Sequence, residues 1–233
     1  IAVDGQGAMR VDLLRDAIAA DRAAGCLPFL IVGTAGSVNT GAFDDLGALS
    51  VVAEANGMWF HVDGAFGALM ALAPSLRPRL AGIERSQSIA FDFHKWAHVP
   101  YDAGFLIVRD ADAHRRTFAN PATYLQRAPR GLAAGETWPC DIGPDLSRGF
   151  RALKTWLTLT TFGADALGAS IDRCCRVARH LEQALRTSDM FEVAAPVTLN
   201  VVVWRVRGDV DDAINQETVM ELHERGIAVP SMT

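Results

Sequence analysis

Residues 28–64 read PFLIVGTAGSVNTGAFDDLGALSVVAEANGMWFHVDG, and this stretch decides the fold. It starts with an apolar run that closes on Gly and Ser, which is typical of a buried parallel strand. A helical segment follows at residues 44–57, with acidic residues at its start and Gly57 at its end. A second apolar run, MWFHV, comes directly after it. Strand, helix and strand in this order predict two parallel strands joined by a crossover helix.

The same alternation extends on both sides of this stretch. Residues 11–24 have helical periodicity, and the runs SQSIAFD (86–92) and GFLIVRD (104–110) predict two further strands. The connection between Lys95 and the last run is too short for a helical crossover, so the last two strands are expected to be antiparallel. We therefore predict an α/β fold, with a mostly parallel sheet and helices on both faces.

The second half of the chain has a different character. Residues 119–149 are rich in Pro and Gly, which predicts a long loop. Helical periodicity then returns and continues, with a break after residue 163, through residue 187. A strand and a helix follow, as at the start of a small α+β domain. We expect residues 1–187 to be part of a large domain with its connecting helices, and residues 188–233 to be the truncated start of a small C-terminal domain.

The composition excludes several classes of protein. The chain has 233 residues, half of them hydrophobic, and a formal net charge of −5 without long runs of one sign. No basic stripe indicates nucleic-acid binding, and no apolar run reaches the ~18 residues of a membrane span. The four cysteines show neither CxxC spacing nor a metal-binding pattern. We interpret them as reduced thiols of a cytoplasmic protein, with Cys140 as a loop residue rather than a nucleophile.

Small and ionisable residues follow the ends of the predicted parallel strands, where open α/β sheets bind ligands. They are Gly36, Ser37, Asn39 and Thr40 after the first strand, Asp63, Gly64 and Ala65 after the second, and Asp92, His94 and Lys95 after the third. Asp63 directly follows an apolar strand, where a carboxylate is costly unless it is paired. Two interpretations stay open for it: a cap of the next helix, or an acid that holds a cationic ligand atom.

Lys95 is unusual because the chain otherwise uses arginine. Of the 22 Lys and Arg side chains, only Lys95 and Lys154 are lysines. A lone lysine after a strand is usually a solvated end. An amine, however, can lose its proton and attack a carbonyl carbon, whereas a guanidinium cannot in practice. A carboxylate for a ring nitrogen and a lysine for a Schiff base are the two protein groups that pyridoxal 5′-phosphate (PLP) needs.

The segment HVDGAFGA (61–68), followed by the lysine of DFHKW (92–96), resembles the group II PLP-dependent amino-acid decarboxylases. That family includes the aromatic-amino-acid, glutamate and histidine decarboxylases. The segments GTAGSVNTGAFDDL, YDAGFLIVRD and LSRGFRALKTWLTL also resemble family segments, in the family's order. The resemblance covers essentially the whole chain. It implies the large domain of a fold-type I PLP-dependent transferase-like enzyme. The implied activity is the decarboxylation of an L-amino acid, such as an aromatic one, through a Schiff base on Lys95.

The resemblance also implies roles for single residues. Lys95 would carry the cofactor, Asp63 would pair with the pyridinium nitrogen, and Ala65 would pack against one face of the ring. The further residues that it implies near the cofactor, its phosphate or the substrate are Asp92, His94, Ser37 and Asn39. His61 is interpreted as a satisfied core histidine rather than a catalyst.

Some features depart from the family pattern. Family chains are longer, and the residues that stack on the cofactor and bind its phosphate are expected upstream of Ile1. Asp92 stands where the family usually has a phosphate-side Asn. The segment GETWPCDIGPD (135–145) matches the loop on which family members carry a proton-donating tyrosine, but it contains none. The nearest loop tyrosine is Tyr124. Family members are homodimers with shared active sites, so the resemblance implies the same here.

Three alternatives remain open. One is a PLP-dependent carbon–carbon lyase similar to sphingosine-phosphate lyase, whose segments around the lysine are alike. Another is an aldehyde-forming oxidative deaminase, which the absence of the loop tyrosine favours. The last is a non-catalytic, truncated homologue that acts as a dimerisation partner and binds no cofactor.

Overall fold

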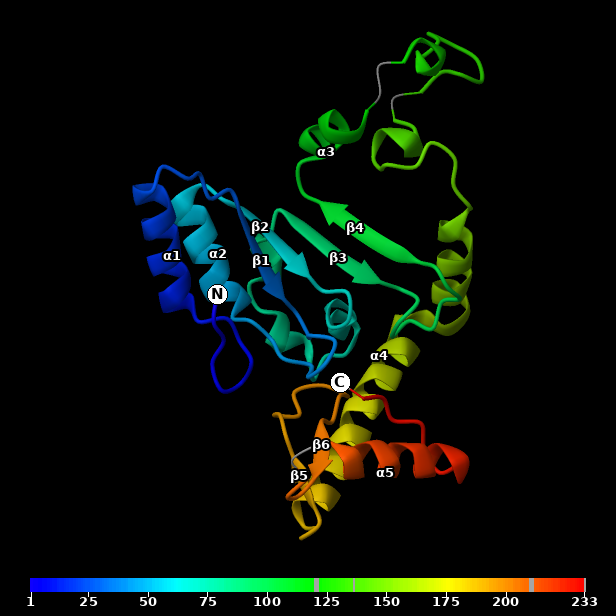
Figure 1. The fold of residues 1–233 in the computed structure, drawn as a ribbon. Coiled ribbons are helices and arrows are strands. Elements are labelled where there is room, and N and C mark those ends of the chain that lie inside the picture. The colour runs from blue at the N-terminus through cyan, green and yellow to red at the C-terminus, as the bar shows by residue number, and fades with distance from the viewer. Residues whose placement is uncertain (120–121, 136, 210–211, 233) are drawn as a thin grey trace.

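The structure is a computed structural model that describes residues 1–119, 122–135, 137–209 and 212–232. A four-stranded sheet lies at its centre (Figure 1). In order, its strands are β1 (Leu30–Thr34), β2 (Trp59–Asp63), β3 (Ser88–Asp92) and β4 (Gly104–Val108). The first three are parallel and β4 is antiparallel to β3. The predicted α/β fold with a mostly parallel sheet is confirmed, and so is the antiparallel last pair.

Two helices pack on one face of this sheet. α2 (Leu46–Asn56) contacts β1 and β2, and α1 (Val11–Ala23) packs against α2. α2 begins at Asp45, whose side chain accepts a hydrogen bond from the backbone N–H of Ala48. It ends at Gly57, whose φ of 64° is a left-handed conformation that suits glycine. The crossover helix predicted between the first two strands is therefore present.

The opposite face of the sheet is open. Leu30 and Val32 on β1 are each 41% exposed, whereas Ile31 between them is buried. Because side chains alternate along a strand, Leu30 and Val32 belong to the face that points away from α2. The described helices leave these residues uncovered. Within the described residues, no helix packs over β1 on this second face.

Short 3-10 helices connect β2 with β3. They are η1 (Ala68–Leu72), η2 (Arg77–Leu80) and η3 (Ile83–Arg85). An α-helix does not continue from η1 because a proline follows it at Pro74. The residue before a proline is driven toward extended backbone, and Ala73 has φ −104° and ψ 106°.

The chain beyond β4 leads away from the sheet. α3 (Ala111–Phe118) is followed by the predicted long loop, which contains the short helices η4 (Thr123–Leu125) and η5 (Pro139–Asp141). Residues 120, 121 and 136 of this loop lie outside the described residues. The loop occupies the top of Figure 1, beyond α3.

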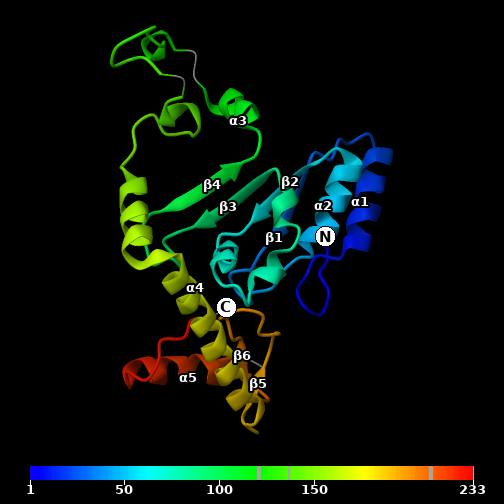
Figure 2. The same cartoon turned by 180° about the vertical axis from the view of Figure 1, so that it is seen from behind.

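A long helix then returns past the sheet. α4 (Arg151–Arg186) has non-helical φ and ψ of 77° and 159° at Gly163. This kink lies where the sequence divides the helical region into two segments. The second half of α4 leads to a small unit at the bottom of Figure 1, which Figure 2 shows from behind.

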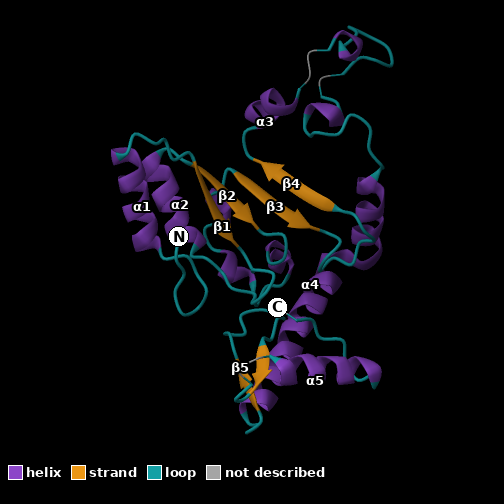
Figure 3. Cartoon of the chain, in the orientation of Figure 1, coloured by secondary structure: helices purple, strands orange, loops and turns teal. Residues whose placement is uncertain are grey.

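The small unit has two strands and one helix. β5 (Phe191–Val193) pairs with β6 (Trp204–Val206) in antiparallel fashion, and α5 (Ala213–Glu224) follows (Figure 3). The sequence predicts the second strand and the helix but not β5. The strand predicted around β6 is longer than observed, because only three of its residues pair with β5.

Candidate functional site

The predicted site residues come together at one edge of the sheet because of its topology. The carboxyl ends of parallel β1, β2 and β3 lie at the same edge, and antiparallel β4 begins there. In the register, Thr34 pairs with Asp63, and Asp63 pairs with Ala90. Asp92 pairs with Gly104 at the start of β4. The residues that follow these strand ends, and those that precede β4, are therefore neighbours in space.

The segment between β3 and β4, residues 92–103, is named here the edge turn. Three predicted site residues contact one another within it. Lys95 Nζ lies 2.7 Å from Asp92 Oδ2, and His94 Nε2 lies 3.7 Å from the same oxygen. The side chain of His94 is buried, whereas about a third of that of Lys95 is exposed. Asp92, which the resemblance assigns to the phosphate or the substrate, is here the ion-pair partner of Lys95.

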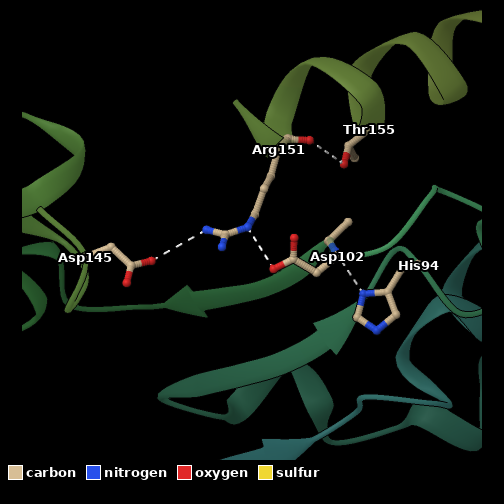
Figure 4. Close-up of polar contacts among 6 residues, drawn as sticks. His94, Asp102, Asp145, Arg151 and Thr155 are labelled. Carbon is tan, nitrogen blue, oxygen red and sulfur yellow. Dashed lines mark hydrogen bonds and ion pairs between the residues drawn. The ribbon is translucent and has the colours of Figure 1, made fainter. Parts of the chain in front are cut away.

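A backbone hydrogen bond fixes the orientation of the His94 ring. The N–H of Ala103 donates to His94 Nδ1 over 2.9 Å (Figure 4). Because Nδ1 accepts this bond, the proton of the neutral ring lies on Nε2. The Nε2 atom is the one that lies nearer to Asp92. His94 is therefore held with its N–H donor, Nε2, 3.7 Å from the carboxylate of Asp92.

Apolar residues of the edge turn anchor it in the core. Trp96 is 6% exposed, and Ala97 and Val99 are buried. The indole ring of Trp96 packs against Phe66, with ring centroids 4.9 Å apart. Since the residue after Lys95 is fixed in the core, the amine of Lys95 is directed from a rigid base rather than from a mobile loop.

Asp63 lies at the end of β2 and is exposed. Its Oδ1 accepts a hydrogen bond of 3.0 Å from the backbone N–H of Ala65. The sequence leaves open whether Asp63 caps the next segment or holds a ligand. In the structure, one of its carboxylate oxygens accepts a hydrogen bond within the turn after β2. In the described part of the chain, no hydrogen bond to Oδ2 is seen. A side chain at Gly64 would clash with Ala68, 2.6 Å from the position of its Cβ, so local packing requires a small residue there.

His61 has a structural partner, as the sequence interpretation expects. Its Nδ1 lies 2.7 Å from Ser88 Oγ, which also accepts a hydrogen bond of 2.8 Å from the indole N–H of Trp59. Burial lowers the pKa of His61 below its ordinary value, and the nearby charge of Asp63 acts in the opposite direction. His61 is thus a satisfied, partly buried histidine on the same face as Asp63.

Ser37 and Asn39 lie in the turn after β1 at the same sheet edge, but with other contacts. Ser37 Oγ lies 2.8 Å from Thr40 Oγ1 and accepts a bond of 3.0 Å from the backbone N–H of Ala42. Asn39 is exposed and lines a cavity of about 560 Å³ together with residues 200–205. Among the described residues, neither side chain forms a hydrogen bond with the Asp92, His94 and Lys95 group.

Three residues that the sequence analysis missed adjoin this group. The ring of Tyr101 lies 4.1 Å from that of His94, centroid to centroid. Asp102 accepts a hydrogen bond of 2.9 Å from Arg151 Nε at the start of α4, and Arg151 also lies 3.5 Å from Asp145 (Figure 4). The bond from Arg151 holds the pKa of Asp102 below its ordinary value. The signal was available: if the last two strands are antiparallel, the residues before β4 return to the edge of Lys95.

The long loop lies at the other edge of the sheet. η5, which contains Cys140, packs against α3, and α3 follows the far end of β4. Within the loop, the guanidinium of Arg127 lies 4.0 Å from the ring centre of Trp138 and pairs with Asp141. In the segment GETWPCDIGPD, η5 thus lies beside α3 beyond the far end of β4, whereas Asp145 lies 3.5 Å from Arg151, the partner of Asp102. Glu136 of that segment lies outside the described residues.

The described residues lack both a metal-binding cluster and a membrane-spanning helix. They contain no group of three or more His, Cys, Asp or Glu side chains that is arranged to hold a metal ion. Within the same residues, no helix is both long enough and apolar enough to cross a membrane. The four cysteines are free thiols.

The chain is similar in sequence to one family of proteins. A family model described as pyridoxal-dependent decarboxylase conserved domain matches residues 1–207. The histidine decarboxylase of Drosophila melanogaster is 37% identical over 227 residues, which are 97% of this chain and 26% of that protein. The aromatic-L-amino-acid decarboxylase of Bacillus atrophaeus is 33% identical over 239 residues, which cover 100% of this chain and 50% of that protein.

The likeness extends to solved structures. The structure of Oryza sativa TDC with PLP and tryptamine superposes with a TM-score of 0.88 and 28% sequence identity. The superposition covers 98% of this chain and 48% of that one. The chain thus spans half or less of the length of each of these three relatives.

Proposed function

Because the chain belongs to the pyridoxal-dependent decarboxylase family, we propose that it decarboxylates an L-amino acid, with Lys95 as the residue that binds PLP covalently. The observation that carries this proposal is the neighbouring position of the Asp63 carboxylate and the Lys95 amine. They follow the ends of adjacent parallel strands, at the edge where α/β sheets bind ligands. Since the chain covers half or less of its relatives, the activity is proposed for the protein of which these residues are part.

The residues present fit the cofactor. The set of groups at the edge consists of a carboxylate, an amine, an imidazole N–H donor and the small residues Gly64 and Ala65. When bound, PLP draws electrons from the bonds at the substrate's Cα into its protonated ring, so that the bond to the carboxylate can break and CO2 can leave. This chemistry needs an acid partner for a ring nitrogen and a lysine for the aldehyde, and Asp63 and Lys95 supply them.

Asp63 would hold the proton of the pyridine nitrogen through the carboxylate oxygen that does not serve the turn. Its charge would keep that nitrogen protonated, because an anion close to a cationic group favours the charged form. Ala65, whose N–H binds the other oxygen, would present a small side chain to a flat ring. The local turn bond thus supports the ligand role, since it fixes the direction of the carboxylate.

Lys95 would either form the ion pair with Asp92 or bind the aldehyde of the cofactor covalently. Its amine lies 2.7 Å from Asp92 Oδ2, and an amine must release a proton before it attacks a carbonyl carbon. Asp92 would accept that proton or hold it nearby. This role agrees with the observed contact better than a role beside a phosphate, where a carboxylate is unfavourable.

His94 would donate a hydrogen bond from Nε2 to an anionic oxygen, either of the cofactor phosphate or of the substrate carboxylate. The bond from the backbone of Ala103 to Nδ1 supports this, because it leaves Nε2 as the donor. Ser37 and Asn39 stay in the proposal as residues near the cofactor. The hydroxyl of Ser37 would have to bind a ligand in addition to its hydrogen bonds with Thr40 and Ala42.

The arrangement of the whole protein is also proposed. We infer a large domain over residues 1–187 and the start of a small C-terminal domain over residues 188–233. The family resemblance supports a homodimer with shared active sites. The position of η5, beside α3 beyond the far end of β4, agrees with a loop that serves a neighbouring subunit. The cytoplasmic location stays a prediction from the free cysteines.

Covalent labelling tests the proposal directly. PLP is added, the protein is reduced with borohydride, and the modified peptide is identified by mass spectrometry. We expect a pyridoxyl group on Lys95. The chain contains one other lysine, Lys154, which serves as an internal control. The Lys154→Arg variant should keep the label. A protein without label, or with label on Lys154 alone, would overturn the proposal and favour a non-catalytic dimerisation partner.

The products distinguish the remaining alternatives. Labelled protein that releases CO2 and an amine from an amino acid is a decarboxylase. Consumption of O2 with formation of an aldehyde and ammonia would indicate oxidative deamination. Release of an aldehyde from a phosphorylated amino alcohol, without CO2, would indicate a carbon–carbon lyase.

A further inference from the structure

A leucine from the small unit packs against the turn after β1, residues 35–43, which is named here the β1 turn. Leu199 lies in the segment between β5 and β6 and is only 1% exposed. A Cβ added to Gly36 would lie 2.7 Å from Leu199 Cδ1, and a Cβ added to Gly41 would lie 3.3 Å from Leu199 Cβ. Leu199 therefore fills the space that two glycines of the β1 turn leave open.

Hydrogen bonds hold the segment that carries this leucine. Thr198, which precedes it, donates a hydrogen bond from its hydroxyl to the carbonyl oxygen of Gly41. The backbone carbonyl of Thr198 accepts a bond of 2.6 Å from Nη1 of Arg79 in η2. Leu199 is thus held against the β1 turn by contacts of its neighbour with two separate parts of the chain.

The β1 turn connects this contact to the proposed cofactor site. The backbone N–H of Ser37 donates to the carbonyl of Ala42 over 2.9 Å, and its hydroxyl accepts a bond of 3.0 Å from the N–H of the same residue. At the start of the turn, the N–H of Ala35 donates to the carbonyl of Asp63 over 2.8 Å. A displacement of the turn would therefore move the Ser37 hydroxyl and disturb a bond to the backbone of Asp63.

The glycines explain why the β1 turn needs support from outside. Gly36 and Gly41 have φ of 84° and 72°, in the left-handed region that side chains with a Cβ rarely adopt. Glycine permits this conformation, but it loses more conformational freedom on folding than any other residue. Packing offsets this cost, and Leu199 is a buried side chain that covers both glycines.

We propose that Leu199 is a positioning residue of the cofactor site, which holds the β1 turn in the conformation that places Ser37 beside the ligand. Thr198 supports it through the bond to Gly41. The inference rests on the proposed function and adds a dependence of that site on the small unit. Displacement of residues 198 and 199 would weaken cofactor binding without any change to the side chain that binds PLP.

Hydrogen exchange followed by mass spectrometry tests the positioning without any ligand. The peptide that covers residues 35–43 includes the hydrogen-bonded N–H groups of Gly36, Ser37 and Gly41. Leu199→Ala removes the side chain that covers the turn, so exchange in this peptide should become roughly 10-fold faster or more. Leu199→Met keeps the volume of the side chain and should keep the slow exchange.

Leu49→Ala is the matched control, because it truncates a leucine that is equally buried but packs elsewhere. Leu49 lies in α2, and its Cδ1 is 2.9 Å from the position of a Cβ added to Gly33 of β1. This variant should accelerate exchange in the peptides of α2 and β1 more than in the β1 turn. Equal acceleration of the β1 turn in both variants would show that Leu199 acts through global stability, and would overturn the inference.

A titration with PLP measures the consequence for the site. The visible absorbance of the bound cofactor gives the dissociation constant in the full-length protein. If Leu199→Ala leaves the turn in its binding conformation for a tenth of the time, the dissociation constant rises about 10-fold. Leu199→Met and Leu49→Ala should bind PLP with dissociation constants close to that of the unaltered protein.

A milder variant keeps the test decisive if Leu199→Ala does not fold. Thr198→Val nearly keeps the shape of the side chain but cannot donate a hydrogen bond to the carbonyl of Gly41. Exchange in the peptide 35–43 and the dissociation constant for PLP should both rise by roughly 2- to 10-fold. No change in either quantity would show that residues 198 and 199 do not position the turn.

Borohydride labelling of Lys95 in the same samples separates this inference from the proposed function. Unaltered protein that takes up no label refutes the proposed function, and the ligand role of the turn with it. If the unaltered protein is labelled, Leu199→Ala protein that binds PLP as tightly as the unaltered protein refutes only the inference, whatever its exchange rate. Faster exchange of the turn together with weaker PLP binding in Leu199→Ala, and neither in Leu49→Ala, supports both.

Discussion

The edge turn and the long loop both adjoin β4, yet they are held in opposite ways. The edge turn places Trp96, Ala97 and Val99 in the core, buries the His94 ring, and leaves about a third of the Lys95 side chain exposed. In the long loop, the main contacts are internal: Arg127 packs on Trp138 and pairs with Asp141. The comparison teaches that the proposed reactive residues, Asp92, His94 and Lys95, lie on the edge turn, whose backbone is fixed by its buried residues. The long loop, in contrast, contacts the rest of the chain through α3 and through the pair of Asp145 with Arg151.

The largest effect on activity is expected at Lys95, the nucleophilic side chain of the edge turn. Cys140, the thiol of the long loop, provides the comparison. Lys95→Arg keeps the charge but removes an amine that can attack a carbonyl carbon. We expect CO2 release to fall by roughly 1,000-fold or more. Cys140→Ser in the long loop should leave it close to the unaltered rate. The measurement is release of labelled CO2 from carboxyl-labelled amino acids.

A strong effect of Cys140→Ser would break the comparison. It would mean that the loop acts at an active site, which in this fold would be that of a neighbouring subunit. Mixing of inactive Lys95→Arg subunits with Cys140→Ser subunits then tells the two cases apart. Recovered activity requires that the two residues act at the same site from different chains.

The next largest effect is on stability, and it is tested by replacing one tryptophan of each segment. Trp96→Ala removes a buried ring from the core and should lower the free energy of unfolding by about 3–5 kcal/mol. Trp138→Ala removes a half-exposed ring that mainly contacts Arg127, and should cost about 1 kcal/mol. Unfolding by urea, followed by far-UV circular dichroism, gives both values.

A milder substitution keeps this test decisive if Trp96→Ala does not fold. Trp96→Phe retains much of the contact with Phe66 and should cost about 1–2 kcal/mol. Equal costs for the two tryptophan positions would show that the long loop is packed as firmly as the edge turn, against the contrast drawn above.

The smallest effect on stability is expected from the ion pair between Asp102 of the edge turn and Arg151 of α4. Arg151 lowers the pKa of Asp102 in the folded protein, so the unfolded chain binds a proton at Asp102 more readily. The contribution of the pair is therefore fully present above the ordinary pKa of an aspartate, about 4, and is lost as the pH falls through the lower folded value. Asp102→Asn should lower the urea midpoint slightly at pH 7 and not at all at strongly acidic pH.

Because both partners are exposed, this difference should also shrink in added salt. The matched control is Asp112→Asn in α3, whose nearest cation, Arg115, lies 3.9 Å away and at the surface. A difference for Asp102→Asn that does not depend on pH would show that Asp102 acts through packing or backbone contacts rather than through its charge.

Much of the fold could be predicted from the sequence because it depends on local patterns. The apolar runs of β1 and β2, the helical period of α2 and the short connection before β4 each restrict the topology. The kink of α4 falls at Gly163, where the helical pattern breaks. No local pattern, in contrast, reports which elements cover each face of the sheet.

The candidate site was predictable to the same extent. The sequence by itself determined that Asp63 and Lys95 lie at one edge, because Asp63 ends one parallel strand and Lys95 comes shortly after the end of the next. Strand direction follows from connection length, which a sequence displays. The family resemblance follows from the same residues, because the motif spacing reflects the strand spacing.

Only the tertiary structure decided which side chains touch. The pairing of Asp92 with Lys95, the ring contact of Tyr101 with His94 and the turn bonds of Ser37 were not readable from spacing. Arg151 reaches Asp102 from 49 residues away along the chain. Such contacts depend on how separate elements pack, and packing sums many weak interactions over the whole chain, so no local stretch of sequence encodes it.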